Sequence, residues 1–258
     1  MQDLRITLIQ SNLAWEDRDT NLTNFTHKIK PLQGNTDLIV LPEMFTTGFS
    51  MNPAPNAETM QGKSVAWMVQ TAAETGACIT GSLIIEEGGN YYNRLIWATP
   101  QGEILQYNKR HLFTMAGEEK VYTQGTEKLI TTLHGWRICP MICYDLRFPV
   151  WVRNTEEYDV LIFVANWPAA RATHWQKLLP ARAIENQCYA IGVNRIGIDG
   201  TEKPYQGDSQ IINPMGEEIL NLAAADDTAT ATISYETLTK TRRHMPFLKD
   251  RDGFELEV

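Results

Sequence analysis

Hydrophobic and polar residues follow two different spacings along this chain. Short apolar runs predict strands at residues 4–13, 36–43, 136–145, 160–167, 188–197, 205–220 and 229–235, and several more joined by Gly-rich turns within 77–112. Between them, residues 17–32, 64–76 and 174–187 repeat apolar side chains at the spacing of amphipathic helices. This alternation of strands and helices predicts a layered α/β domain.

Local signals at the helix ends refine these predictions. Gly76 is expected to close the helix over 64–76. Thr173 and Gln176 have the spacing of a capping box, which predicts that the third helix begins there. Pro180 lies within this helix, where it is expected to kink the helix or to mark a second start.

The domain organisation is predicted to be simple. No linker, internal repeat or low-complexity tract interrupts the pattern, so residues 1–258 are expected to form one domain. After Tyr235 the periodicity weakens. Residues 236–258 are therefore expected to form a C-terminal arm that packs on the body of the domain or on a partner subunit.

The composition limits the partners and the compartment. The chain of 258 residues has a formal net charge of −8 and a sequence pI of about 5.2. An acidic protein is poorly suited to non-specific binding of nucleic acid or anionic membranes. The N-terminus does not resemble a signal peptide, and no apolar run approaches the roughly 18 residues of a membrane helix. The cysteines are few and irregularly spaced, so we expect free thiols and a cytoplasmic location.

Several common chemistries are disfavoured by residue spacing. The histidines are scattered, and Cys139 and Cys143 lack a second pair at zinc spacing, so no metal site is expected. The Gly-Lys-Ser at residues 62–64 lacks the earlier glycine of a phosphate-binding loop. No Gly-x-Gly-x-x-Gly follows a strand, and no Gly-x-Ser-x-Gly is present. Dinucleotide enzymes and serine hydrolases of that type are therefore disfavoured, and no cofactor is expected.

Polar side chains at the ends of three predicted strands are the candidates for chemistry. Cys143 lies where the apolar run "RICPMIC" gives way to polar residues, whereas Cys139 lies inside the run. Glu43 follows "LIVL", and Lys109 follows "ILQYN". Sites in open α/β folds assemble at strand ends, and a thiol nucleophile needs a base. Taken singly, each residue is more often a packing cysteine, a solvated glutamate or a surface lysine.

Three segments together resemble one enzyme family. "LPE" at 41–43, "YNKRHLF" at 107–113 and "CYDLRFP" at 143–149 resemble, in order and spacing, the signature segments of the nitrilase superfamily, the carbon–nitrogen hydrolases. The resemblance extends over nearly the whole chain, because three further segments are also similar: "NRLIWATPQGEIL", "ANWPAAR" and "LLPARAIENQCYAIGVNRIG". The resemblance implies a four-layer α-β-β-α sandwich and a homodimer, with the C-terminal arm extending onto the partner subunit.

The resemblance also implies a catalytic Glu–Lys–Cys triad at Glu43, Lys109 and Cys143. Cys143 would attack an amide carbonyl to form a thioester, and Glu43 would transfer the protons. Lys109 and the backbone N–H of Tyr144 would hold the oxyanion. We expect Lys109 to favour the thiolate of Cys143, because a positive neighbour lowers a thiol pKa.

Many relatives carry a second glutamate seven residues before a glycine. Counting back from Gly125 selects Glu118 over Glu119, although Gln124 stands where relatives have proline. Glu118 is therefore expected to position Lys109 and the substrate.

The residues after the cysteine indicate a branch of the family. "CYDLRFP" and "HLFTMAGEEKVY" resemble omega-amidases, which hydrolyse the terminal amide of 2-oxoglutaramate or 2-oxosuccinamate to a dicarboxylate and ammonia. The alternatives are another amidase of the family, acting on deaminated glutathione or a carbamoyl amine, and a non-catalytic binding protein on the same fold. Arg147 is expected either to bind the distal carboxylate of the substrate or to pair with Asp145 or a helix end. Phe45, Phe49 and Trp167 are expected as pocket walls or else as core residues.

Overall fold

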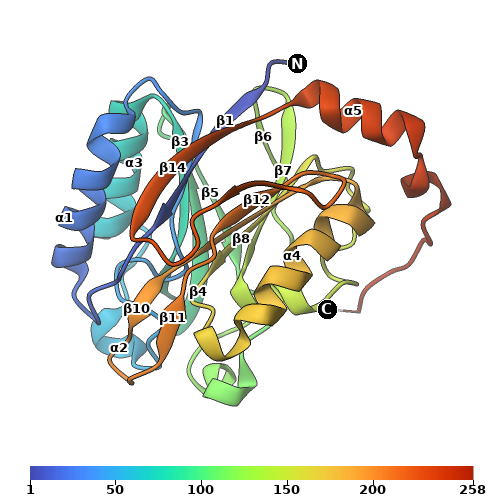
Figure 1. Cartoon of the computed structure of the whole chain (residues 1–258). Coiled ribbons are helices and arrows are strands. Elements are labelled where there is room, and N and C mark those ends of the chain that lie inside the picture. Colours follow the sequence, from blue (N-terminus) through green and yellow to red (C-terminus); the bar gives the residue numbers. More distant parts are fainter. Residues whose placement is uncertain (258) are drawn as a thin grey trace.

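Two six-stranded sheets packed face to face form the centre of the computed structural model, which describes residues 1–257 (Figure 1). The first sheet has the order β14-β1-β2-β3-β4-β5, with bounds Asp227–Ile233, Leu4–Gln10, Leu38–Val40, Cys78–Glu87, Asn90–Ala98 and Ile104–Asn108. The second has the order β13-β12-β9-β8-β7-β6, with bounds Glu218–Asn221, Gln210–Ile212, Tyr189–Asn194, Val160–Ala165, Trp136–Ile142 and Thr131–Leu133. A separate two-stranded ribbon pairs β10, Ile196–Ile198, with β11, Pro204–Gln206.

The middle of each sheet is parallel. In the first sheet β1, β2 and β3 run in the same direction, with Val40 opposite Thr80. In the second sheet β7, β8 and β9 do the same, with Ile142 opposite Val164. Because parallel neighbours end at the same edge, the residues that follow these strands gather at one edge of each sheet.

Helices cover the outer faces and complete four layers. α1 (Arg18–Ile29) and α3 (Lys63–Thr75) pack on the first sheet, and α4 (Ala172–Asn186) packs on the second (Figure 1). Alternate side chains of β1 divide between two cores, since Leu8 lies in the core between the sheets and Ile9 in the core beneath α1 and α3. This arrangement confirms the predicted α-β-β-α sandwich.

Shorter helical segments connect these layers. α2 covers Pro53–Asn56, and 3-10 turns cover Lys30–Leu32, Thr114–Ala116, Glu118–Lys120, Cys143–Arg147, Ala169–Arg171 and Phe247–Asp250. The predicted start of the third helix was wrong: α4 begins at Ala172, Arg171 occupies the N-cap position, and Thr173 lies inside the first turn. The preceding 3-10 turn leads directly into α4, so no separate capping box forms there.

Pro180 lies inside α4, and the helix continues past it to Asn186 as one element. Proline removes one helical hydrogen bond, so the helix needs support from packing. Gly192 of β9 allows that packing, because a Cβ atom there would lie 2.5 Å from both Trp175 Cζ2 and Leu179 Cδ1. The close contact between α4 and β9 holds the helix through the proline.

The C-terminal segment is more regular than its sequence pattern suggests. α5 covers Tyr235–His244 and lies at the edge of the molecule (Figure 1). Arg242 of α5 binds Asp159, with 2.7 Å between Nη1 and Oδ1, and donates to the carbonyl oxygen of Tyr158 at 2.6 Å. The start of the predicted arm is thus anchored on its own chain. Val258, its last residue, lies outside the described residues.

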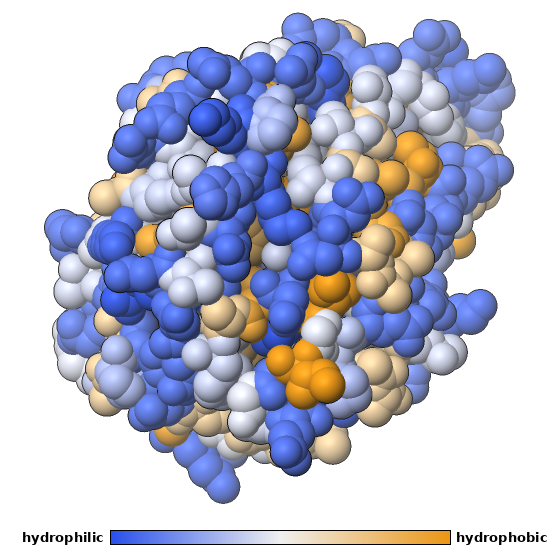
Figure 2. All heavy atoms as spheres, turned by 60° about the vertical axis from the view of Figure 1, so that its left-hand side comes forward, coloured by the Kyte–Doolittle hydropathy of each residue, from blue (hydrophilic) through white to orange (hydrophobic). Residues whose placement is uncertain are grey.

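Three structural findings concern membrane helices, metal ligands and the cysteines. Within residues 1–257, no helix combines the length and the apolar composition needed to cross a membrane. Over the same residues, no group of three or more His, Cys, Asp or Glu side chains is arranged to hold a metal ion. Cys78, Cys139, Cys143 and Cys188 are buried free thiols, as predicted. The face shown in Figure 2 is mostly hydrophilic, with small, scattered hydrophobic patches.

Candidate active site

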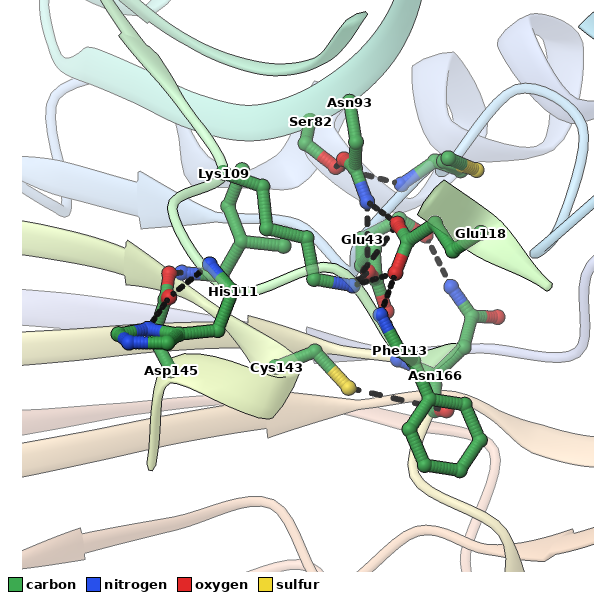
Figure 3. Close-up of polar contacts among 12 residues, drawn as sticks. Glu43, Ser82, Asn93, Lys109, His111, Phe113, Glu118, Cys143, Asp145 and Asn166 are labelled. Atoms are coloured by element: carbon green, nitrogen blue, oxygen red, sulfur yellow. Dashed lines mark hydrogen bonds and ion pairs between the residues drawn. The ribbon is translucent and has the colours of Figure 1, made fainter. Parts of the chain in front are cut away.

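Chain segments that follow four strands place polar side chains around one point between the two sheets (Figure 3). Glu43 lies three residues after β2, and Lys109 comes directly after β5. Cys143 comes directly after β7, and Asn166 directly after β8. Glu118 reaches the same point from a 3-10 turn. Residues that the sequence placed in separate motifs are therefore neighbours in the fold.

The ammonium of Lys109 is the centre of this cluster. Nζ donates to Oε1 of Glu43 at 2.9 Å, and to Oε1 and Oε2 of Glu118 at 3.0 and 2.9 Å. The same nitrogen lies 5.0 Å from the ring centroid of Phe49. The side chains of Glu43, Lys109 and Glu118 are fully buried, whereas Glu119 is exposed. Glu118 is thus the second glutamate that contacts the lysine.

A buried amide orders the two carboxylates from the other side. Nδ2 of Asn93 donates to Oε1 of Glu43 at 2.7 Å and to Oε1 of Glu118 at 3.2 Å. The Ser82 hydroxyl accepts from the backbone N–H of Met44 at 2.8 Å and donates to Oδ1 of Asn93 at 2.8 Å. Since Oδ1 accepts this bond, the NH₂ group of Asn93 faces the carboxylates.

The candidate nucleophile lies on a tight turn after β7. Cys143 opens a 3-10 turn with a backbone φ of 43°, in the left-handed region that non-glycine residues seldom adopt. Its Sγ lies 3.9 Å from the carbonyl oxygen of Asn166, and the residue is 8% exposed. The N–H of Asn166 donates to Oε2 of Glu43 at 2.8 Å. Asn166 therefore contacts both the thiol and the carboxylate.

Burial and charge act in opposite directions on the buried ions. Burial disfavours the ammonium of Lys109, but the charges of Glu118 and Glu43 outweigh it and raise the pKa of Lys109 above its ordinary value. Burial also raises the pKa of Glu118, and the charge of Lys109 offsets only part of this rise. One ammonium is the shared ion-pair partner of two carboxylates, so its removal would leave both without a counter-charge.

Three effects set the pKa of the Cys143 thiol. Burial and the negative charge of Glu43 raise it well above its ordinary value. Lys109 lowers it, as expected from its charge, but by less than the other two effects raise it. The net shift favours the protonated thiol, and the neighbouring carboxylate of Glu43 is placed to accept its proton.

A cavity of about 340 Å³ opens beside Cys143. Tyr144 lines it together with Phe49 and Trp167, the last two as predicted. The expectation that Phe45 is a pocket wall was wrong. Its ring packs in the core beneath α1 and α3, 5.4 Å from the ring centroid of Phe25. Phe45 lies inside the turn over residues 43–47, which directs its side chain away from the cavity.

Two guanidinium groups give the cavity a positive wall. Arg147 stacks over Trp167 with 4.6 Å from Cζ to the ring centroid, and its Nη2 donates to Nδ1 of His174 in the first turn of α4. Arg171 lies over the ring of Phe113 at 5.2 Å. Among residues 1–257, neither arginine forms an ion pair with a carboxylate. Burial and the charge of Arg171 lower the pKa of Arg147. An anionic ligand would relieve this repulsion.

The sequence-based predictions did not include three residues of the site. Asn166 had a usable signal, because it directly follows the apolar strand "VLIFVA" at the edge where Cys143 was expected. Asn93 begins the segment "NRLIWATPQGEIL" and Arg171 ends the segment "ANWPAAR", so both lie in segments that carry the family resemblance. The sequence did not indicate that either side chain faces the site, and only the fold shows it.

Comparison with known proteins agrees with this geometry. The family model described as carbon-nitrogen hydrolase matches residues 5–243. The chain is 46% identical to omega-amidase YafV of Yersinia enterocolitica, covering 99% of this chain and 100% of that protein. It is 30% identical to the 2-oxoglutaramate amidase of Bacillus subtilis, covering 95% of this chain and 96% of that protein.

A solved structure extends the similarity to three dimensions. The crystal structure of XC1258 from Xanthomonas campestris, a CN-hydrolase superfamily protein, matches with a TM-score of 0.98. The two chains are 44% identical, and the match covers 100% of each. The family model spans most of the chain, and the relatives in sequence and in fold match it over nearly its whole length. This chain therefore belongs to the carbon–nitrogen hydrolases of the nitrilase superfamily.

Proposed function

We propose that this protein is an omega-amidase, which hydrolyses the terminal amide of a small 2-oxo dicarboxylic acid monoamide to the dicarboxylate and ammonia. The observation that carries the proposal is a thiol beside a buried Glu–Lys–Glu cluster, at a cavity with two arginines that lack carboxylate partners among the described residues. A volume of about 340 Å³ is near the lower end for ligand pockets and suits a small substrate. The names of the Yersinia and Bacillus relatives support the same reaction.

In the first half of the reaction, Cys143 Sγ attacks the amide carbon while Glu43 takes the thiol proton. The resulting oxyanion is held by the Lys109 ammonium and the backbone N–H of Tyr144. The intermediate collapses, the C–N bond breaks, and Glu43 gives its proton to the leaving nitrogen. Ammonia departs and leaves a thioester on Cys143. Because the thiol pKa is raised, this step needs Glu43 as the base that accepts the proton.

In the second half, Glu43 takes a proton from water as the water oxygen attacks the thioester carbon. The same donors hold the second oxyanion. Its collapse breaks the C–S bond, releases the carboxylic acid and returns the proton from Glu43 to the sulfur. Glu118 takes part by holding the Lys109 ammonium at both of its oxygens, so that the lysine stays charged and oriented.

The substrate is tested by measuring product formation with mass spectrometry. We expect rapid conversion of 2-oxoglutaramate and slow conversion of deaminated glutathione by the same preparation. Rapid turnover of the peptide with none of the 2-oxo amide would contradict the proposal and favour the peptide amidase. An absence of turnover for every amide would favour a binding protein.

The two cavity arginines are expected to bind the distal carboxylate of the substrate. Replacing Arg171 or Arg147 with glutamine should raise KM for 2-oxoglutaramate about 10–100-fold, the usual range for losing a charge-assisted hydrogen bond. Turnover of a neutral amide of similar length should change little. Lys177→Gln, which removes an exposed charge from α4, is the control and should leave both KM values unchanged. Equal KM values for wild type and both arginine variants would exclude this role.

We also propose the assembly that the family resemblance implies and the location that the cysteine content and the acidic composition favour. The protein is a cytoplasmic homodimer, and the arm formed by residues 236–258 contributes to the contact between subunits. Exposed Phe247, Phe254 and Leu256 in this arm support that proposal, because they are apolar side chains available to a partner. Sedimentation velocity on the full chain measures the assembly state directly.

A further inference from the structure

The carboxylate of Asp145 lies two residues after Cys143 and is fully buried. It contacts four donors. Oδ1 lies 3.0 Å from the backbone N of His111 and 2.8 Å from Nδ1 of the same residue. Oδ2 lies 2.8 Å from the hydroxyl of Tyr107 and 3.1 Å from the backbone N of Ile142. The mechanism above gives this carboxylate no role.

The direction of each hydrogen bond follows from its partners. The Tyr107 hydroxyl accepts from Nε1 of Trp151 at 3.1 Å and from the backbone N–H of Arg110 at 3.2 Å, so its own proton points to Asp145. The backbone N–H groups can only donate. With Asp145 accepting throughout, Nδ1 of His111 carries the proton that it shares with Oδ1. The carboxylate is therefore satisfied without an arginine or lysine.

The donors come from the two segments that carry Lys109 and Cys143. Tyr107 and His111 flank Lys109 by two residues on either side, and Ile142 immediately precedes Cys143. In Figure 3, His111 and Asp145 lie to one side of Lys109, while the Lys109 side chain extends the other way towards Glu118. One carboxylate thus ties the segment that carries the lysine to the turn that carries the thiol.

We infer that Asp145, together with His111, is a positioning residue that sets the distance and orientation between Cys143 and Lys109. The inference rests on the proposed catalytic roles of those two residues. A left-handed backbone at Cys143 persists only where the surroundings hold it, and the bond from Ile142 N–H to Asp145 holds the residue just before it. Misplacing a reacting group by about 1 Å costs up to roughly 100-fold in rate.

The test compares three single variants and one double variant with a matched control. Asp145→Asn and His111→Leu should each lower kcat about 10–100-fold with KM little changed. His111→Asn should restore most of the kcat, because its amide N–H can take the place of Nδ1–H. The double variant, Asp145→Asn with His111→Leu, should be no slower than Asp145→Asn alone, since both changes break the same contact between Asp145 and His111. Asp159→Asn is the control: Asp159 accepts from the backbone N–H of Arg137 at the opposite end of β7. It should lower the melting temperature and leave kcat unchanged.

A second measurement does not depend on the substrate. The rate at which iodoacetamide alkylates Cys143, followed by mass spectrometry of its peptide, should fall in Asp145→Asn and His111→Leu but not in Asp159→Asn. Folded Asp145→Asn and His111→Leu proteins with wild-type kcat and alkylation rate would overturn the inference and leave a purely structural role. If the wild type hydrolyses no amide but the alkylation rates differ as expected, the proposed function fails and the positioning role stands.

Discussion

Replacing Cys143 with alanine is expected to lower the rate of ammonia release by more than about 10⁴-fold. Glu43 and Lys109 can assist an attack on the amide carbon, but without the sulfur there is no nucleophile and no thioester. The change removes one atom at a residue that is 8% exposed, so the fold should persist. Ammonia release and the circular dichroism spectrum are measured on the same preparation of the variant. The two measurements together separate a loss of catalysis from a loss of structure.

Cys139→Ala is the matched control for this prediction. Cys139 lies in β7, four residues before Cys143, and is fully buried on the face of the second sheet that α4 covers. Its removal should cost about 1 kcal/mol of unfolding free energy through a small cavity, and most of the activity should remain. Equal loss of activity from the two variants, with unchanged circular dichroism, would contradict the assignment of Cys143 as the nucleophile.

Replacing Lys109 with methionine is expected to have two large effects. The loss of an oxyanion donor should lower kcat by at least about 10²–10³-fold. The loss of the ammonium also leaves Glu43 and Glu118 buried without their counter-charge, which typically costs about 3–5 kcal/mol of stability. Lys120→Met is the control, because it removes an exposed charge from the 3-10 turn that also contains Glu118. It should change neither kcat nor stability.

The stability loss in Lys109→Met should depend on pH with a definite sign. The pKa of Glu118 is already raised in the folded protein, and removing Lys109 raises it further because that charge lowers it. A group whose folded pKa is raised binds its proton more tightly in the folded state, so stability is greatest below the unfolded pKa of about 4.3 and falls as pH rises. Urea unfolding at a series of pH values should show the variant weakening relative to wild type as pH rises above the unfolded pKa of about 4.3. A pH-independent difference would indicate that the carboxylates are not neutralised by Lys109.

Much of the catalytic centre was predictable from the sequence. Glu43, Lys109 and Cys143 each follow a strand whose apolar pattern is plain, and strand ends are where a sheet can present polar side chains. The count back from Gly125 selected Glu118, which the structure places on Lys109. The apolar run at residues 160–167 predicted a strand, and every residue of β8 within it is buried.

Other features depended on contacts between segments far apart in the chain. Phe45 follows a motif residue, yet its ring lies in the helix-covered core, because a turn of the chain decides which face a side chain meets. The contacts of Asn93, Arg171 and Asp145 could not be predicted from the segments that contain them, since each contact depends on the approach of another strand or loop. The capping-box spacing at Thr173 was overridden by the preceding 3-10 turn.

The sequence by itself determined the residue types, their order at strand ends and the layered fold, because periodicity and turn chemistry are local properties of the chain. Tertiary structure decided the direction in which the pKa of Cys143 shifts. A nearby lysine predicts a lowered thiol pKa, but the net direction is a sum of burial, the Glu43 charge and the Lys109 charge. The size of each contribution depends on distance and solvent exposure, and both exist only once the two sheets have packed together.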